Sequence, residues 1–168
     1  MAWSINTIVG ASPKEEHLAR AKILLGHLLS IRNSSQEGGW DDHFRGVERF
    51  LDFLSNPKDD LVRSIFEVVS RDRHTPWDFY QLVEYMYKHK DSDPRGVGDL
   101  FVTIVKHSSV VPNYPEDKIV EICQTLESAG QNDTLISICR AYSDRSPSCA
   151  PIFDVCSRVT EPFAAKKD

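Results

Sequence analysis

Long apolar runs are missing from this sequence, and so are the short motifs by which many enzymes are recognised. No stretch reaches the roughly 18 consecutive apolar residues of a membrane-spanning helix, so we expect no contact with a membrane. Residues 1–12 lack a basic region followed by a long apolar core, and we expect no signal peptide. The glycines at 38–39 and 96–98 lack the flanking residues of a phosphate-binding loop. We therefore expect no enzymatic activity and no bound cofactor.

Closely spaced cysteine pairs are lacking as well. The cysteines are Cys123, Cys139, Cys149 and Cys156, all in the last third of the chain and none in a Cys-x-x-Cys pattern. A structural zinc site usually contains a close pair of ligands, whereas cysteine is among the residue types most often buried. We therefore expect buried free thiols, no metal site and a reducing, cytoplasmic environment.

Positive charge is in deficit. The chain of 168 residues carries a net charge of −5, which argues against binding to duplex nucleic acid, because such binding usually requires a basic face. Apolar residues make up 40% and charged residues 27%, a balance typical of a folded globular domain. The length fits a single soluble domain with a substantial core.

Prolines recur at regular intervals and mark the expected helix starts. Pro57, Pro76, Pro94 and Pro115 follow one another at intervals of about twenty residues. Proline is favoured at the first position of a helix, where its missing N–H would have no partner anyway. The residues before the first three are Asn56, Thr75 and Asp93, whose side chains can cap free N–H groups of the first turn.

Apolar residues between these starts follow helical periodicity, which predicts an all-α fold. Val47, Phe50, Leu51 and Leu54 illustrate the pattern in one segment. We expect a single domain over residues 1–168, with tails at 1–13 and 161–168, a first helix pair at 14–55 with a flexible loop at 33–40, and repeat-like pairs over 57–160. The expected helices cover about residues 14–32, 41–55, 57–72, 76–90, 94–108, 115–129, 133–144 and 150–160.

The helices show a weak internal repeat. A shift of 39 residues places Leu61 on Leu100 and Pro76 on Pro115. This period of paired helices over roughly residues 41–160 resembles the HEAT and armadillo repeats. The resemblance implies a short right-handed α-solenoid of about eight helices in antiparallel pairs, in which neighbouring pairs share a core. An irregular helical bundle remains the alternative fold.

The segment from Pro76 to Tyr87 is the most distinctive part of the chain. Helical projection puts Phe79, Leu82, Val83 and Met86 on one face, and the nearly opposite face carries Trp77, Gln81, Tyr85 and Lys88. Trp and Tyr dominate many interfaces, so these last four residues are our predicted partner-binding set. The alternative is core packing, because a helix with neighbours on two sides can bury more than half of its circumference.

Basic residues gather at the ends of two predicted helices. In an alternating stack, the turns after residues 57–72 and 94–108 lie on the same edge. Together these turns carry a possible anion-binding rim of Arg71, Arg73, His74, Lys106 and His107. Solvated loop charges are the alternative interpretation.

Two smaller patterns involve histidine. Arg20 and His27 are seven residues apart on one helix face, and this pair resembles the motif of HEPN-type helical ribonucleases. Asp41-Asp42-His43 could bind a metal, but at a helix start these carboxylates suit the helix dipole. A chance pair and a helix cap are the interpretations we favour.

The function indicated by these patterns is a non-catalytic scaffold or adaptor that binds another protein or peptide, either alone or as part of a larger protein. Extended surfaces of stacked helix pairs suit this task. The alternative is a helical domain that binds nucleic acid or processes RNA, and it is suggested by Arg20, His27 and the basic rim.

Overall fold

The computed structural model describes residues 15–34, 46–72, 75, 79–146, 152 and 154–158, and all regular structure within them is helical. The prediction of an all-α fold is therefore confirmed. The elements are α2 (Glu15–Ser34), the 3-10 helix η1 (Val47–Phe53), α3 (Asp60–Asp72), α4 (Tyr80–His89), α5 (Pro94–His107), α6 (Glu116–Ser128) and α7 (Asn132–Arg145). Residue 152 and residues 154–158 are also helical and are called the C-terminal segment below.

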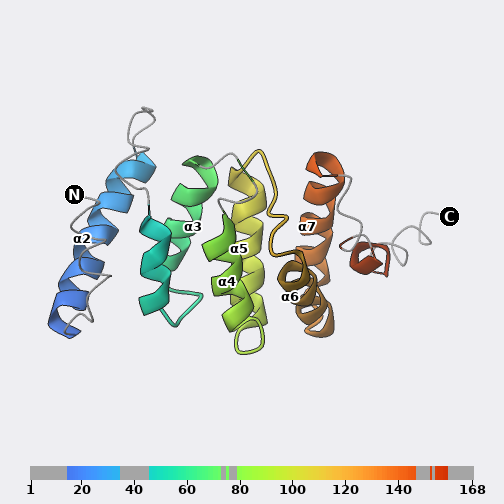
Figure 1. Cartoon of the computed structure of the whole chain (residues 1–168), viewed down its shortest axis with the longest axis horizontal. Coiled ribbons are helices and arrows are strands. Elements are labelled where there is room, and N and C mark those ends of the chain that lie inside the picture. The colour runs from blue at the N-terminus through green and yellow to red at the C-terminus, as the bar shows by residue number, and fades with distance from the viewer. Residues whose placement is uncertain are drawn as a thin grey trace.

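The helices stand side by side along the long axis of the molecule, from α2 at one end to α7 at the other (Figure 1). Helices α2, α3, α5 and α7 are successive neighbours in one row, and η1, α4 and α6 are successive neighbours in a second row. The right-handed solenoid of antiparallel pairs and the membership of the HEAT or armadillo families stay predictions. Among the described residues, no helix has both the length and the apolar composition needed to cross a bilayer.

One continuous apolar core runs through the molecule and joins the two rows. Phe66 of α3, Met86 of α4 and Phe101 of α5 are completely buried in it. Each such side chain contributes about 1.5–3 kcal/mol relative to exposure to water. Tyr142 of α7 packs edge-on against Phe101, with 6.3 Å between ring centroids, and donates its hydroxyl hydrogen to the Pro112 carbonyl. The core therefore also includes the connection between α5 and α6.

Two of the expected helix starts differ in their outcome. Asp93 caps α5 as predicted, because its carboxylate accepts the Gly96 N–H at 3.0 Å and Pro94 is the first helical residue. The prediction that Asn56 caps a helix beginning at Pro57 is wrong, since α3 begins at Asp60. The Asn56 side chain accepts the Lys58 N–H in a local turn instead, and Asp59 accepts the Leu61 N–H at 2.9 Å.

The α-helix expected over 41–55 is a 3-10 helix in its described part, Val47–Phe53. Gly46 precedes it with a φ of 87°, a left-handed conformation that glycine adopts without steric cost. Leu54 after it is extended, so the element is confined to seven residues. Val47, Phe50 and Leu51 are buried. These residues of the predicted apolar pattern thus face the core, although the helix type differs.

The two glycines of α5 serve packing. A Cβ on Gly98 would lie 3.0 Å from the Thr134 methyl and 3.3 Å from a Leu126 methyl, so the missing side chain lets α5 approach α6 and α7. A Cβ on Gly96 would lie 3.0 Å from the Pro57 Cβ and would clash with Asp93. Both glycines are therefore explained by close approach.

The expectation of free thiols is wrong for two cysteines. Cys139 of α7 and Cys156 of the C-terminal segment form a disulfide, with 5.6 Å between their Cα atoms. Their separation of 17 residues gives no sequence signal, because only the packing of the segment on α7 brings them together. Cys123 is buried in α6, and Cys149 lies outside the described residues. The thiol-based argument for a reducing environment therefore does not hold for this pair.

Candidate partner-binding groove

A groove of about 450 Å³ opens where α4 lies between η1 and α6. Helix α4 supplies Gln81, Glu84, Tyr85 and Lys88, which are spaced by three or four residues and therefore share one helix face. The full lining is Leu51, Asp52, Gln81, Glu84, Tyr85, Tyr87, Lys88 and Lys118. Three members of the predicted partner-binding set, Gln81, Tyr85 and Lys88, thus line one groove, while Trp77 lies outside the described residues.

Tyr85 is buried, since only 5% of the residue is accessible, and this agrees with the alternative of core packing for this side chain. Its ring packs edge-on against Phe66, at 6.0 Å between centroids, and lies tilted against the His89 ring at 4.6 Å. Burial, and to a lesser extent the negative charge of Asp59, raises the pKa of Tyr85 to about 12. Neighbours on several sides of α4 bury this face too, so Tyr85 forms the floor of the groove.

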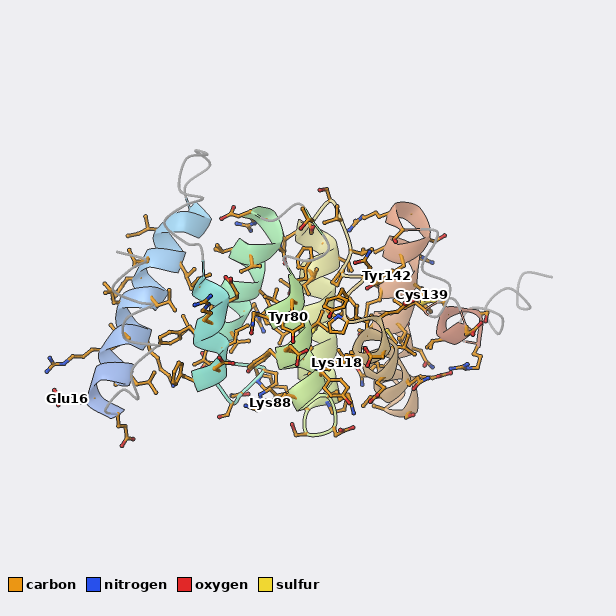
Figure 2. The ribbon with its side chains drawn as sticks, viewed as in Figure 1. Glu16, Tyr80, Lys88, Lys118, Cys139 and Tyr142 are labelled. Carbon is orange, nitrogen blue, oxygen red and sulfur yellow. A yellow bond between two sulfur atoms is a disulfide. The ribbon has the colours of Figure 1, made fainter. Side chains whose placement is uncertain are left out.

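On the α6 side of the groove, an ion pair connects α6 to α4. The Lys118 ammonium lies 2.6 Å and 2.7 Å from the two carboxylate oxygens of Glu84. The hydrogen bond to Glu84 is the main cause that raises the pKa of Lys118. Figure 2 shows Lys118 beside α4, with Tyr80 and Lys88 toward opposite ends of that helix. The bridge fixes the distance between α4 and α6.

The Tyr87 ring lies next to this ion pair. Lys90 and Lys118 place their ammonium groups 5.0 Å and 5.1 Å from the centre of the Tyr87 ring, in cation–π geometry. The Tyr87 hydroxyl donates to Glu121 at 3.0 Å, and this hydrogen bond raises the pKa of Tyr87. The groove is thus bordered by a connected network of aromatic and charged groups.

A second aromatic contact stands at the start of α4. Tyr80 and Tyr114 stack with 5.9 Å between centroids, and both remain substantially exposed. The negative charge of Glu84 and a hydrogen bond to it raise the pKa of Tyr80. Exposed tyrosines are common in protein interfaces, because a tyrosine side chain loses little conformational entropy when it binds.

Three polar side chains of the groove are unengaged. Asp52 and Lys88 are exposed and Gln81 is partly buried, and none of them forms a hydrogen bond or ion pair with a described residue. They offer a carboxylate, an ammonium and an amide that can both donate and accept. The groove therefore retains both signs of charge and an unused amide.

Sequence reasoning missed the groove residues outside α4. Leu51 and Asp52 come from η1, and Lys118 comes from α6. Helical periodicity assigns each residue to a face of its own helix and does not say which faces meet. Leu51 was identified only as part of an apolar helical pattern, and in the structure it is both buried and part of the groove lining.

The predicted anion-binding rim is partly described. Arg71, Lys106 and His107 are exposed, and the C-terminal ends of α3 and α5 lie at the same edge (Figure 1). Lys106 and His107 occupy the last turn of α5, where positive charge suits the helix dipole. Arg73 and His74 lie outside the described residues. The dipole therefore accounts for the basic residues of α5 without a bound anion.

Both residues of the ribonuclease-like pair lie on the exposed surface of α2. Arg20 forms an exposed ion pair with Glu16 at 2.6 Å, and His27 is exposed on the same helix. Within the part of the chain that the structure describes, no group of three histidine, cysteine or carboxylate side chains is placed to hold a metal ion. Residues 41–43 lie outside the described ranges.

Comparison with known proteins gives no relative. No family model, curated protein or solved structure matches the chain.

Proposed function

We propose that this chain is a protein interaction module that receives a segment of a partner protein in the groove between η1, α4 and α6. The observation that carries the proposal is that Gln81, Tyr85 and Lys88 line one open groove of about 450 Å³. A groove of this size suits a few peptide residues, since pockets for small ligands span about 300–1,000 Å³.

The chemistry of the lining favours a peptide over other ligands. The Gln81 amide complements the backbone amides of an extended chain, because it both donates and accepts hydrogen bonds. Lys88 can bind an acidic side chain, and Asp52 can bind a basic one. The floor formed by Leu51 and the Tyr85 ring is buried and largely apolar. A partner segment with opposite charges on either side of an apolar residue satisfies all of these groups.

Rigid walls support this use of the site. The bridge between Glu84 and Lys118 and the packing of Tyr85 hold the groove open before a partner arrives. A preformed site binds more tightly than one that must be ordered on binding. Tyr80 and Tyr114 extend the contact surface beyond the groove with exposed aromatic area.

A displayed library of random peptides, selected on the full chain, tests the proposal. We expect selected peptides to lose at least about tenfold in affinity for a Gln81→Ala/Lys88→Glu variant, because each lost hydrogen bond to a charged group costs about 1.5–3 kcal/mol. Lys106→Glu is the matched control, since it makes the same charge change at an exposed residue outside the groove. Peptides that bind both variants as well as the original chain would contradict the proposal.

A fluorescent single-stranded RNA provides the competing outcome. The net charge of −5 predicts no binding even at low salt, where electrostatic binding is strongest. If this RNA binds and the Gln81→Ala/Lys88→Glu variant abolishes the binding, the groove serves nucleic acid and the peptide proposal fails.

A further inference from the structure

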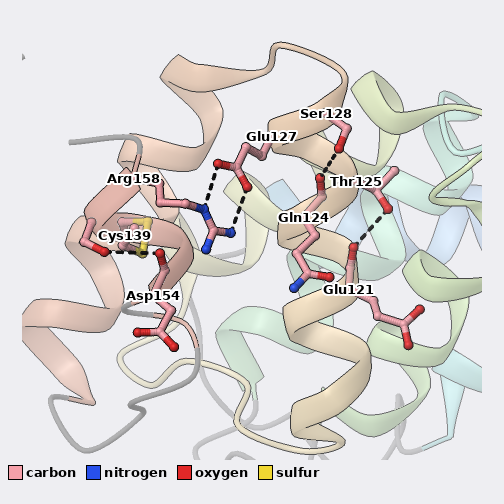
Figure 3. Close-up of polar contacts among 10 residues, drawn as sticks. Glu121, Gln124, Thr125, Glu127, Ser128, Cys139, Asp154 and Arg158 are labelled. Atoms are coloured by element: carbon pink, nitrogen blue, oxygen red, sulfur yellow. Dashed lines mark hydrogen bonds and ion pairs between the residues drawn. A yellow bond between two sulfur atoms is a disulfide. The ribbon is translucent and has the colours of Figure 1, made fainter. Parts of the chain in front are cut away.

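The C-terminal segment, residue 152 with residues 154–158, is attached to the two last helices by contacts of different kinds. Ile152 and Val155 are buried in the core. The disulfide of Cys139 with Cys156 ties the segment to α7. Arg158 forms two hydrogen bonds with Glu127 of α6, at 3.2 Å and 3.0 Å (Figure 3).

The segment depends on these contacts because its described residues are too few to form a stable helix by themselves. Helices below roughly 12 residues are marginal in water without tertiary packing. Within the segment, the Ser157 hydroxyl donates to the Asp154 carbonyl, and this local bond does not tie the segment to the other helices. Whether the segment stays docked is therefore decided by α6 and α7.

The ion pair is a weak attachment. The Arg158 side chain is 52% exposed and the Glu127 side chain is 30% exposed, so water and salt screen the interaction. The hydrogen bond to Arg158 is the main cause that lowers the pKa of Glu127. This contact orients the segment, and the covalent link to Cys139 is the attachment that salt and exposure do not weaken.

We propose that the disulfide between Cys139 and Cys156 is a redox-controlled lock on the C-terminal end of the helical row, and that its reduction releases the segment from α6 and α7. In a chain closed over 17 residues, the link restricts the detached state. Loop closure of that length shifts the balance toward docking by on the order of 100-fold. This inference is independent of the peptide-binding proposal.

The chemistry is thiol–disulfide exchange with a dithiol reductant. One reductant thiolate attacks a cystine sulfur, forms a mixed disulfide and displaces the other cysteine as a thiolate, which takes up a proton. The second reductant thiol then releases the remaining cysteine as a thiol and leaves as a cyclic disulfide. Two electrons and two protons pass from the reductant to the cystine. A small-molecule disulfide such as oxidised glutathione reverses the sequence.

Access to the sulfur atoms makes the lock slow. Cys139 is 5% exposed and Cys156 is 6% exposed, so a reductant reaches them only when the segment opens transiently. The lock therefore reports a sustained change of redox conditions. Once open, the end of the row exposes the apolar surface that Ile152 and Val155 cover in the locked state.

Hydrogen exchange with mass spectrometry on the full chain tests the lock. Samples treated with dithiothreitol or with oxidised glutathione are compared after thiol counting by alkylation has established the state of the disulfide. We expect the amides of residues 154–158 to exchange about 100-fold faster in the reduced state. The amides of α3 and α5 should be unchanged, which shows that the domain remains folded.

Variants separate the lock from general effects of reduction. Cys156→Ser should exchange as the reduced chain does under both conditions, while Cys149→Ser should keep the full redox response. Glu127→Gln in the oxidised state should retain protection, because the disulfide still holds the segment. Equal protection of residues 154–158 in both states, with the disulfide shown to be reduced, overturns the proposal. Loss of protection throughout α3 and α5 on reduction overturns it as well, because the disulfide would then maintain the whole domain.

Discussion

The Lys118 ammonium lies within 2.7 Å of both carboxylate oxygens of Glu84. The two residues are 34 positions apart in the chain, and their contact joins α4 to α6. Glu16 and Arg20 approach equally closely, at 2.6 Å, but within one helix. The two ion pairs differ in exposure. The side chains of the first are 27% and 29% exposed and those of the second are 77% and 69% exposed. At the same distance, the less exposed pair should therefore contribute more to the free energy of unfolding than the exposed pair.

We predict that a double-mutant cycle separates these two pairs. Glu84→Gln and Lys118→Met should show a coupling of about 0.5–1 kcal/mol in urea unfolding, because partial burial limits screening. Glu16→Gln and Arg20→Met should show a coupling of at most about 0.3 kcal/mol. Equal coupling energies would mean that partial burial does not strengthen the ion pair between Glu84 and Lys118.

The cap of α5 supports a second prediction. Asp93→Ala should destabilise the chain by about 1 kcal/mol, since the Gly96 N–H loses its acceptor. Asp93 also pairs with Lys58 at 3.0 Å, and Asp93→Asn should lose this ion pair while keeping the cap, with a smaller cost. Asp99→Ala removes an exposed carboxylate of the same helix and serves as the control in chemical denaturation. A full effect of Asp93→Asn would assign the stabilisation to Lys58.

A helix start could be predicted from the sequence where the residues of one short segment determine it. Asp93-Pro94 combines a cap with a favourable first residue, and the helix starts there. At Asn56 and Asp59 two capping residues stand three positions apart. The sequence does not show which of them begins the helix, and the structure uses Asn56 in a turn instead.

Long-range relationships could not be predicted in the same way. Gln81 and Lys88 share a helix face by periodicity alone, so this common face could be predicted from one helix. The approach of Lys118 to that face depends on how α4 and α6 pack. The burial of Tyr85 depends on Phe66 of α3. Such pairings are set by packing between helices, and helical periodicity within one segment carries no information about them.

The buried hydroxyl of Tyr142 supports a third prediction. It donates to the Pro112 carbonyl, which lies in a buried residue of the loop between α5 and α6. Tyr142→Phe should cost about 1–3 kcal/mol, because a buried carbonyl then lacks this donor. Tyr87→Phe removes the exposed hydroxyl that contacts Glu121 and should change stability little. Thermal unfolding of the two variants measures the difference, and similar losses would show that burial of the hydroxyl is not what matters.

The last prediction concerns His89, which is 8% exposed and whose Nε2 atom has no hydrogen-bond partner among the described residues. Burial, and next the positive charge of Lys88, lowers the pKa of His89. The unfolded chain then binds a proton more readily than the folded chain, so stability rises with pH in this range. The contribution is fully present above the unfolded pKa of about 6.5 and is lost as the pH falls toward the lower folded pKa.

Urea unfolding between pH 7.5 and pH 5 measures this dependence. His89→Leu removes the titrating group and should flatten the stability profile, since leucine fits an apolar site without a charged form. His107→Gln is the matched control, because it removes an exposed imidazole at the end of α5. A slope that survives in His89→Leu would place the proton uptake elsewhere in the chain. A slope that is lost in His107→Gln would contradict the role of burial, because this imidazole is already in contact with water.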